Sequence, residues 1–256
     1  MSDNQISRAD LLGVQISAIN MQQALATIDE WLRFRQPNYI CVTSAHGVIE
    51  AQEQPELRHI LNQSGLSTPD GMSIVWLLKL MGHRNVGRVY GPDLMLAVCE
   101  QSIEKGYRHY LFGGAEGVAD KLAAALQTRF PGLQIAGTYC PPFHIPSPEE
   151  DQMMVDLINQ SGADIVWVGI STPKQERWMA SHLGQLEAPV MVGVGAAFDF
   201  LSGVKRQAPR WIQRSGLEWL FRLANEPRRL WPRYIQYPGF ILKAAAQLLG
   251  SKNYPS

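Results

Sequence analysis

One carboxylate in this sequence is placed as a chemically active group would be. Asp70 lies between Pro69 and Gly71, directly ahead of the apolar run 73–80. Pro69 fixes its own φ and Gly71 permits a positive φ, so the pattern predicts a tight turn at a helix start. Such a turn can present a carboxylate to a cleft, and the N–H groups of the helix N-terminus keep it ionised. An ordinary turn with a helix cap explains the same spacing.

Polar side chains also follow two apolar, strand-like runs. Thr43 ends the first run and His46 follows it, and Lys174 and Gln175 come after the second. Open α/β sheets place ligands at the carboxyl ends of their strands, which makes these residues site candidates. Gln175 both donates and accepts hydrogen bonds, as the recognition of sugar hydroxyls requires. Helix capping is the alternative interpretation, including a capping box around residue 176.

Glycines follow two further predicted strands. Gly113 and Gly114 begin a G-G-x-x-G turn that ends at Gly117, and Gly193 and Gly195 follow the last apolar strand. Glycine lets a ligand approach the backbone closely, so both turns are candidates for holding a phosphate, a sugar or a flat ring. The first turn is half of a dinucleotide fingerprint. A nucleotide-binding oxidoreductase of the Rossmann type is therefore the alternative function.

Arginines supply the positive charge. Arg88 precedes a Gly-Pro-Asp turn, where it either pairs with a phosphate or carboxylate or is a surface charge. Residues 1–203 hold 13 Lys+Arg against 21 Asp+Glu, net −8, whereas residues 204–256 hold 10 against 2, net +8. Aromatic residues are interleaved with this basic tail, which favours nucleic acid, a membrane surface or a diphosphate as its ligand. The tail arginines that we single out are Arg214, Arg222, Arg229 and Arg233.

Alternating strand and helix patterns predict an α/β protein with a parallel sheet. We expect a core domain at 1–203 and a basic, aromatic-rich helical appendage at 204–256, with short or kinked helices where Pro227 and Pro232 interrupt the pattern. The predicted strands are 14–16, 39–43, 110–112, 134–138, 164–169 and 190–194, and the predicted helices are 21–34, 48–62, 73–80, 94–104, 118–130, 149–161 and 175–186.

The composition is typical of a soluble globular protein. The chain has 256 residues, of which 46% are hydrophobic and 18% charged. Cys41, Cys99 and Cys140 are scattered and odd in number, as expected for reduced cysteines in the cytosol. We expect no signal peptide and no membrane span, because neither apolar pattern is present.

The ordered set of motifs resembles the WecG/TagA/CpsF glycosyltransferases, family 26. The resemblance covers nearly the whole chain, and its specificity lies in the order of the motifs rather than in any single one. The motifs are Val-Thr-Ser-Ala-His at 42–46, Thr-Pro-Asp-Gly at 68–71, Arg-Val-x-Gly-x-Asp at 88–93, Leu-Phe-Gly-Gly at 111–114, Gly-x-x-x-Pro-Lys-Gln-Glu at 169–176, Gly-Val-Gly-x-x-Phe-Asp at 193–199, Ala-Pro-x-Trp at 208–211 and Gly-Leu-Glu-Trp at 216–219.

The resemblance implies a Rossmann-like fold termed GT-E and a metal-independent, inverting transfer of a sugar. The sugar, typically N-acetylmannosamine, moves from a UDP donor to a polyprenyl-diphosphate-linked sugar on the inner face of the bacterial membrane, in cell-surface polysaccharide or teichoic acid synthesis. Members of the family can self-associate. Ala45 replaces an asparagine common in the family, and relatives use UDP-glucose or other hexoses, so the donor is left open.

The family's functional residues carry over to named positions. Asp70 matches the general base, with Thr43 and Arg88 beside it, and Gln175 matches a donor-sugar contact. The arginines at 222, 229 and 233 resemble those that fold over the UDP diphosphate. We expect no metal or other cofactor, because Asp-x-Asp is absent and arginines can neutralise a leaving diphosphate.

A nonenzymatic nucleic-acid module is a further alternative, based on the basic tail alone. The body of the chain is acidic and carries no known RNA- or DNA-binding signature. We therefore expect no nucleic-acid partner. The expected partners are the UDP-sugar, the lipid-linked acceptor and an anionic membrane surface contacted by the appendage.

Overall fold

The computed structural model describes residues 6–250. These residues form two compact units, each assembled from separate stretches of chain. The first unit contains the described residues up to Met21, together with Val42–Tyr90 and the residues from Gln207 onward. The second contains Gln22–Cys41 and Gly91–Arg206. The residues after 206 therefore group with the first unit, and the separate domain at 204–256 stays a prediction.

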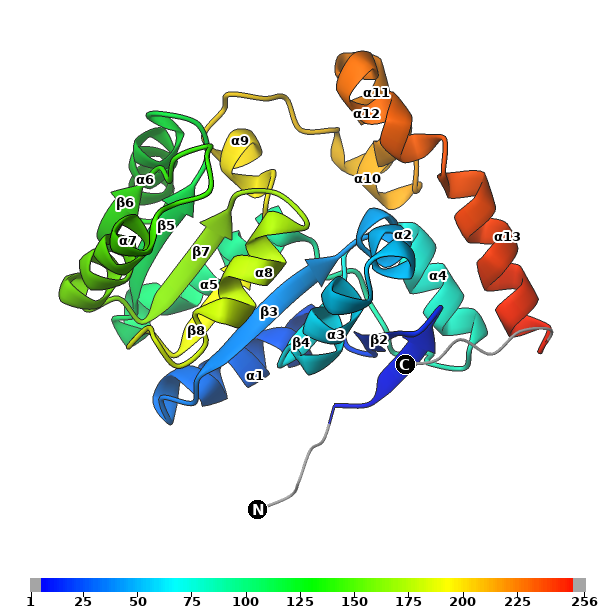
Figure 1. Cartoon of the computed structure of the whole chain (residues 1–256), viewed down its shortest axis with the longest axis horizontal. Coiled ribbons are helices and arrows are strands. Elements are labelled where there is room, and N and C mark those ends of the chain that lie inside the picture. Colours follow the sequence, from blue (N-terminus) through cyan, green and yellow to red (C-terminus); the bar gives the residue numbers. More distant parts are fainter. Residues whose placement is uncertain (1–5, 251–256) are drawn as a thin grey trace. The chain divides into compact units, whose positions relative to one another are not determined.

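A six-stranded sheet confirms the predicted α/β class. Its strand order is β4-β3-β8-β7-β5-β6, and the pairs β3/β8, β8/β7, β7/β5 and β5/β6 are all parallel (Figure 1). Residues Ile165–Val168 of β7 are fully buried, which is why this strand reads as a continuous apolar run. The strands are β3 (Asn38–Thr43), β4 (Leu66–Pro69), β5 (Arg108–Gly113), β6 (Gln134–Tyr139), β7 (Ile165–Gly169) and β8 (Val190–Gly193).

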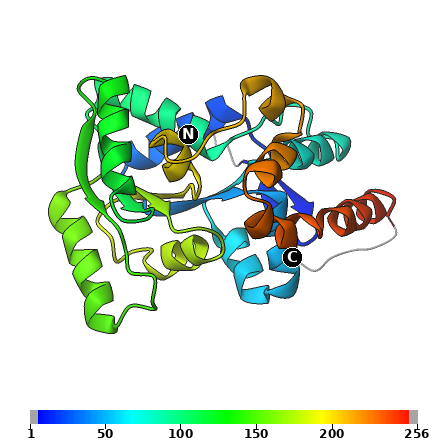
Figure 2. The ribbon, with the colours of Figure 1, turned by 90° about the horizontal axis from the view of Figure 1, so that it is seen from above.

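Helices cover both faces of the strands in the second unit. Helices α5 and α6 lie on one side of these strands and α7 and α8 on the other (Figure 2). The predicted helix at 94–104 begins earlier, at Gly91, because the Gly-Pro-Asp turn forms its first turn. The helices are α1 (Met21–Arg33), α5 (Gly91–Lys105), α6 (Val118–Arg129), α7 (Pro148–Ser161), α8 (Lys174–Ser181) and α9 (Ala197–Leu201).

The first unit differs from the expectation at two places. The helix predicted at 48–62 is two helices, because Pro55 has no N–H to continue the first and begins the second. Residues 8–17 form an antiparallel hairpin that the sequence did not predict in full. The elements are β1 (Arg8–Leu11), β2 (Val14–Ser17), α2 (Ala45–Glu53), α3 (Pro55–Gln63) and α4 (Met72–Leu80).

Four helices form the end of the first unit. Pro227 begins a new helix, as predicted, but Pro232 lies inside the same helix instead of ending it. The side chain of Gln247 ties the last helix to the hairpin, because it accepts from the N–H of Leu12 at 2.9 Å and donates to the carbonyl of Asp10 at 3.0 Å. The helices are α10 (Arg210–Arg214), α11 (Glu218–Asn225), α12 (Pro227–Tyr234) and α13 (Tyr237–Leu248).

Candidate functional site

Hydrogen bonds hold the turn that carries Asp70 on three sides. The N–H of Asp70 donates to the carbonyl of Thr43 at 3.1 Å, and the N–H of Val89 donates to the carbonyl of Pro69 at 2.9 Å. The guanidinium Nε of Arg88 donates to the carbonyl of Asp70 itself. The predicted positive φ at Gly71 is not used, since its φ is −91°. The half-buried carboxylate of Asp70 therefore lies on a fixed backbone just ahead of α4.

Buried hydroxyls lie beside this turn at the ends of β3 and β4. Thr43 is 3% exposed, and its Oγ1 is 2.8 Å from the hydroxyl of Ser67. The Oγ1 of Thr68 is buried without a hydrogen-bond partner. A buried hydroxyl of this kind can still accept or donate one bond, because its proton rotates to suit the partner. The ends of β3 and β4 thus place buried hydroxyl groups beside the carboxylate of Asp70.

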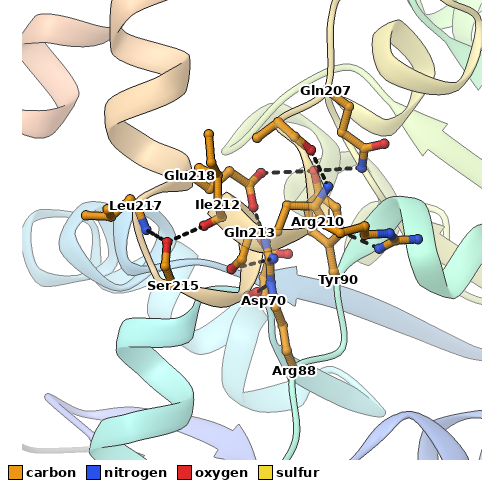
Figure 3. Close-up of polar contacts among 11 residues, drawn as sticks. Asp70, Arg88, Tyr90, Gln207, Arg210, Ile212, Gln213, Ser215, Leu217 and Glu218 are labelled. Atoms are coloured by element: carbon orange, nitrogen blue, oxygen red, sulfur yellow. Dashed lines mark hydrogen bonds and ion pairs between the residues drawn. The ribbon is translucent and has the colours of Figure 1, made fainter.

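Arg88 is fully engaged with the protein around it (Figure 3). Its Nη2 is 2.6 Å from Oε2 of Glu218, its Nη1 is 3.5 Å from the carbonyl of Gln213, and its guanidinium carbon lies 4.0 Å from the centre of the Tyr90 ring. Burial lowers the pKa of Arg88, but the carboxylates of Asp70 and Glu218 outweigh this effect and leave the pKa above its ordinary value. Arg88 does pair with a carboxylate, and that carboxylate belongs to the chain itself.

Two tail arginines create a positive potential beside His46. Burial and then the charges of Arg233 and Arg222 lower the pKa of His46 to about 4. Burial also lowers the pKa of Arg233, and repulsion by Arg229 and Arg222 lowers it further. Positive charges that repel one another favour the binding of a small anion between them. His46, Arg222 and Arg233 thus lie close enough in the first unit for their charges to interact.

The other two tail arginines take different positions. Arg229 is exposed and makes two bonds to the carboxylate of Glu226, from Nε at 2.6 Å and from Nη2 at 2.7 Å. Arg214 is exposed at the end of α10. Neither takes part in the hydrogen bonds given above for the Asp70 turn. Their predicted contact with substrate stays a prediction.

A second polar cluster lies after β7 in the second unit. Gln175 and Glu176 are 3% and 2% exposed, and Oε1 of Glu176 accepts from Thr172 at 2.8 Å and from Gln175 at 3.1 Å. Oε1 of Gln175 and Oε2 of Glu176 are buried without hydrogen-bond partners. Burial raises the pKa of Glu176. The capping box considered for this segment is absent, because the residue before α8 is Pro173, and Lys174 is exposed.

The glycine turns of the second unit are tightly packed. A Cβ on Gly113 would lie 2.6 Å from the backbone of Gly169, and one on Gly114 would lie 2.8 Å from Val118. A Cβ on Gly193 would lie 2.7 Å from Met179 and 3.1 Å from the amide of Gln175. Contacts within the protein therefore account for glycine at 113, 114 and 193. Gly195 has a φ of +48° and approaches the unpartnered oxygen of Gln175.

The predicted site residues thus form two groups. Asp70, Thr43, Arg88, His46 and the arginines belong to the first unit, and Gln175, Lys174 and the glycines belong to the second. The sequence alone assigned no role to Glu218 or Tyr90, and it indicated only a crevice-facing or helix-capping role for Glu176. Glu218 did carry a signal, as one of only two acidic residues in the basic tail.

The described residues offer neither a cluster of metal ligands nor a helix that could span a membrane. No three His, Cys, Asp or Glu side chains of residues 6–250 are grouped as they would be to hold a metal ion. Within the same range, every helix is too short or too polar to cross a bilayer.

Known proteins resemble the chain along nearly its whole length. The model of the Glycosyl transferase WecG/TagA/CpsF family matches residues 9–254. The N-acetylglucosaminyldiphosphoundecaprenol N-acetyl-beta-D-mannosaminyltransferase of Bacillus spizizenii W23 is 30% identical over 192 residues, which are 75% of this chain and 72% of the relative. The protein of the same name from Staphylococcus aureus MW2 is 26% identical over 241 residues, which are 93% of this chain and 92% of the relative.

Proposed function

The chain belongs to the Glycosyl transferase WecG/TagA/CpsF family, and on that premise we propose that it transfers N-acetylmannosamine from a UDP donor to a polyprenyl-diphosphate-linked N-acetylglucosamine. The names of the relatives support the sugar and the lipid-linked acceptor. The observation that carries the proposal for this chain is the Asp70 turn, which three backbone carbonyl contacts hold beside arginines of the same unit. The nucleotide-binding oxidoreductase is the less favoured function.

Asp70 is the general base of the proposed reaction. The acceptor hydroxyl attacks the anomeric carbon, its proton passes to the carboxylate of Asp70, and the bond from that carbon to the UDP oxygen breaks. Attack opposite the leaving group inverts the anomeric configuration. A positioned base of this kind contributes roughly 10²- to 10⁴-fold to the rate. Gln175 contacts the donor sugar through its unpartnered amide oxygen.

Arg222 and Arg233 neutralise the charge that develops on the departing UDP. Burial and then repulsion by Arg229 and Arg222 lower the pKa of Arg233, and a diphosphate that binds between Arg222 and Arg233 relieves this repulsion. The charges of Arg233 and Arg222 help to keep His46 neutral, and its ring N–H can donate a hydrogen bond to the same anion. These groups supply the electrostatic function for which many transferases use a metal, so we propose a metal-independent reaction.

The final helices are the proposed contact with the inner face of the membrane. Trp231 is 59% exposed, Ile235 61% and Leu242 72%, in a segment that also exposes basic residues such as Lys243. Apolar side chains insert at the lipid boundary, and each nearby basic residue adds about 1 kcal/mol on an anionic surface. Self-association, which the resemblance implies, stays a prediction that sedimentation velocity can check.

The deciding experiment measures UDP release in EDTA from a panel of UDP-sugars, with and without a lipid-diphosphate N-acetylglucosamine acceptor. We expect release from UDP-N-acetylmannosamine that depends on the acceptor. Asp70→Asn should lower kcat about 10²- to 10⁴-fold with little change in KM, whereas Arg222→Ala should mainly weaken donor binding. Equal loss of donor affinity in both variants would contradict these separate roles, and release from another donor would correct the sugar.

The membrane proposal has a separate test. The double variant Trp231→Ser/Leu242→Ser should bind vesicles containing phosphatidylglycerol less tightly than the wild type in a sedimentation assay. Phe143→Ser is the matched control, since Phe143 is 84% exposed in the second unit. Equal binding by all three proteins would exclude the final helices as the membrane contact.

A further inference from the structure

Glu218 is a half-buried acid, and each of its carboxylate oxygens has a partner within the protein. It is the first residue of α11, and its side chain is 12% exposed. Oε2 pairs with Nη2 of Arg88 at 2.6 Å, and Oε1 accepts from the hydroxyl of Tyr90 at 3.0 Å (Figure 3). Burial and the charge of Glu218 raise the pKa of Tyr90, so the hydroxyl remains protonated and donates. Each oxygen of Glu218 thus has a partner within the first unit.

Through Arg88, Glu218 is connected to the turn that carries Asp70. The same guanidinium donates to the carbonyl of Asp70 and contacts the carbonyl of Gln213 in α10. Because a guanidinium is rigid and planar, its bond to Glu218 fixes the direction of its other N–H groups. The backbone of Asp70 and the start of α11 are therefore held by one side chain.

Through α11, Glu218 also determines the position of Arg222. The two residues are one helical turn apart, so their side chains lie on the same face of the helix. Burial lowers the pKa of Arg222, but facing groups, namely Tyr234, Tyr90, Glu218 and Asp70, outweigh it and raise the pKa. Arg222 thus interacts electrostatically with the carboxylates of Asp70 and Glu218, as Arg88 does.

We propose that Glu218 is a positioning residue that sets α11 so that Arg222 can bind a nucleoside diphosphate beside Asp70. Glu218 acts through Arg88 and Tyr90 and does not touch the substrate. The inference rests on the proposed function and adds to it the residue on which the diphosphate contact depends. The proposed effect is unusual because an acidic residue promotes the binding of an anion.

The test is a double-mutant cycle on UDP affinity, measured by isothermal titration calorimetry. Glu218→Gln should raise the Kd for UDP at least tenfold when it is the only substitution. In the Arg222→Ala background it should raise the Kd less than twofold, because the arginine that Glu218 positions is already absent. Tyr90→Phe removes one of the two bonds to Glu218 and should raise the Kd two- to threefold. Hydrogen exchange should be faster in residues 219–225 of Glu218→Gln while β7 stays protected, which shows that the variant is folded.

Asp29→Asn is the matched control in the second unit. Like Glu218, Asp29 pairs with a basic side chain and with a tyrosine. Its carboxylate contacts the ammonium of Lys105 and accepts from the hydroxyl of Tyr107 at 2.8 Å. It should leave the Kd for UDP unchanged. An equal loss for Glu218→Gln in both backgrounds would overturn the role of Glu218 alone. Unchanged binding of UDP by Arg222→Ala would overturn that role and the proposed diphosphate contact together.

Discussion

The two units hold their candidate site residues by different physical means. In the first unit, charged side chains position one another, as in the contacts of Arg88 with Glu218 and with the carbonyl of Asp70. In the second, close backbone packing positions the residues, as where Gly113 meets Gly169. Electrostatic contacts respond to salt, pH and bound anions, whereas packing contacts respond to added volume.

The difference matches the parts proposed for the two units. Side chains that bind and release a diphosphate are best held by electrostatic contacts, because the charge of the diphosphate can alter those contacts. A group that only recognises a neutral sugar is best held rigidly, so that its hydrogen-bonding atoms stay in place. The contrast predicts opposite sensitivities for the two units, which substitutions can measure.

The largest expected effect is steric and concerns Gly113. Gly113→Ala should lower the free energy of unfolding by roughly 3 to 5 kcal/mol, because the φ of Gly113 is +140° and the new Cβ would lie 2.6 Å from Gly169. Chemical denaturation measures the change. Gly117→Ala is the control, with a φ of +73° and no atom within 4 Å, and should lose only about 1 kcal/mol. Similar losses in both variants would mean that packing does not hold this turn.

A smaller effect is electrostatic and compares two histidines. Burial and two arginines lower the pKa of His46 from 6.5 to about 4, whereas burial alone lowers that of His109 to about 3. The unfolded chain therefore takes up these protons first, and stability that is present above pH 6.5 is lost as the pH falls toward 4. Replacing His46 with Gln should remove at most about 3 kcal/mol of this loss.

Salt separates the two causes. Raising KCl from 0.1 to 0.5 M should raise the pKa of His46 in an NMR titration, because salt screens Arg222 and Arg233. It should leave the pKa of His109 unchanged, because His109 has no charged neighbour among the causes of its shift. An equal response of the two histidines would erase the contrast between the units.

The smallest effect concerns the buried acid of the second unit. Burial raises the pKa of Glu176, so the folded chain keeps this proton while the unfolded chain loses it, and stability falls as the pH rises above 4.5. Glu176→Gln should therefore raise the midpoint of thermal unfolding at pH 8, and raise it by less near pH 4.5. Thermal unfolding at the two pH values measures this. The exposed control Glu187→Gln should leave the midpoint of thermal unfolding at pH 8 nearly unchanged.

The sequence predicted the parts of the fold that depend on local patterns. The apolar run of β7 and the alternation of strands and helices were sufficient for the parallel sheet. The residues around Asp70 were sufficient for the helix start that follows it, although the positive φ that Gly71 permits is not used. The break at Pro55 was missed because the apolar spacing continues across it. Helical periodicity does not reveal a missing N–H.

The contacts of the site itself were less predictable, because they join distant residues. Arg88 and Glu218 are 130 positions apart, and no periodic pattern connects them. The sequence indicated that Arg88 could bind a carboxylate or a phosphate, and only the fold identifies the carboxylate. The packing role of Gly113 is hidden in the same way, since its neighbour Gly169 lies on another strand.

The bond between Gln247 and the hairpin at residues 10–12 has a consequence for the synthesis of the chain. The first unit needs residues from both ends of the sequence, while the second lies entirely within positions 22–206. The ribosome therefore delivers all of the second unit before it has made Glu218, Arg222 or Gln247. A nascent chain can fold its second unit early, but the contacts around Asp70 need residues that are made after the whole of that unit. A chain that is still being synthesised would therefore lack the contacts proposed for catalysis and could not cleave a nucleotide-sugar.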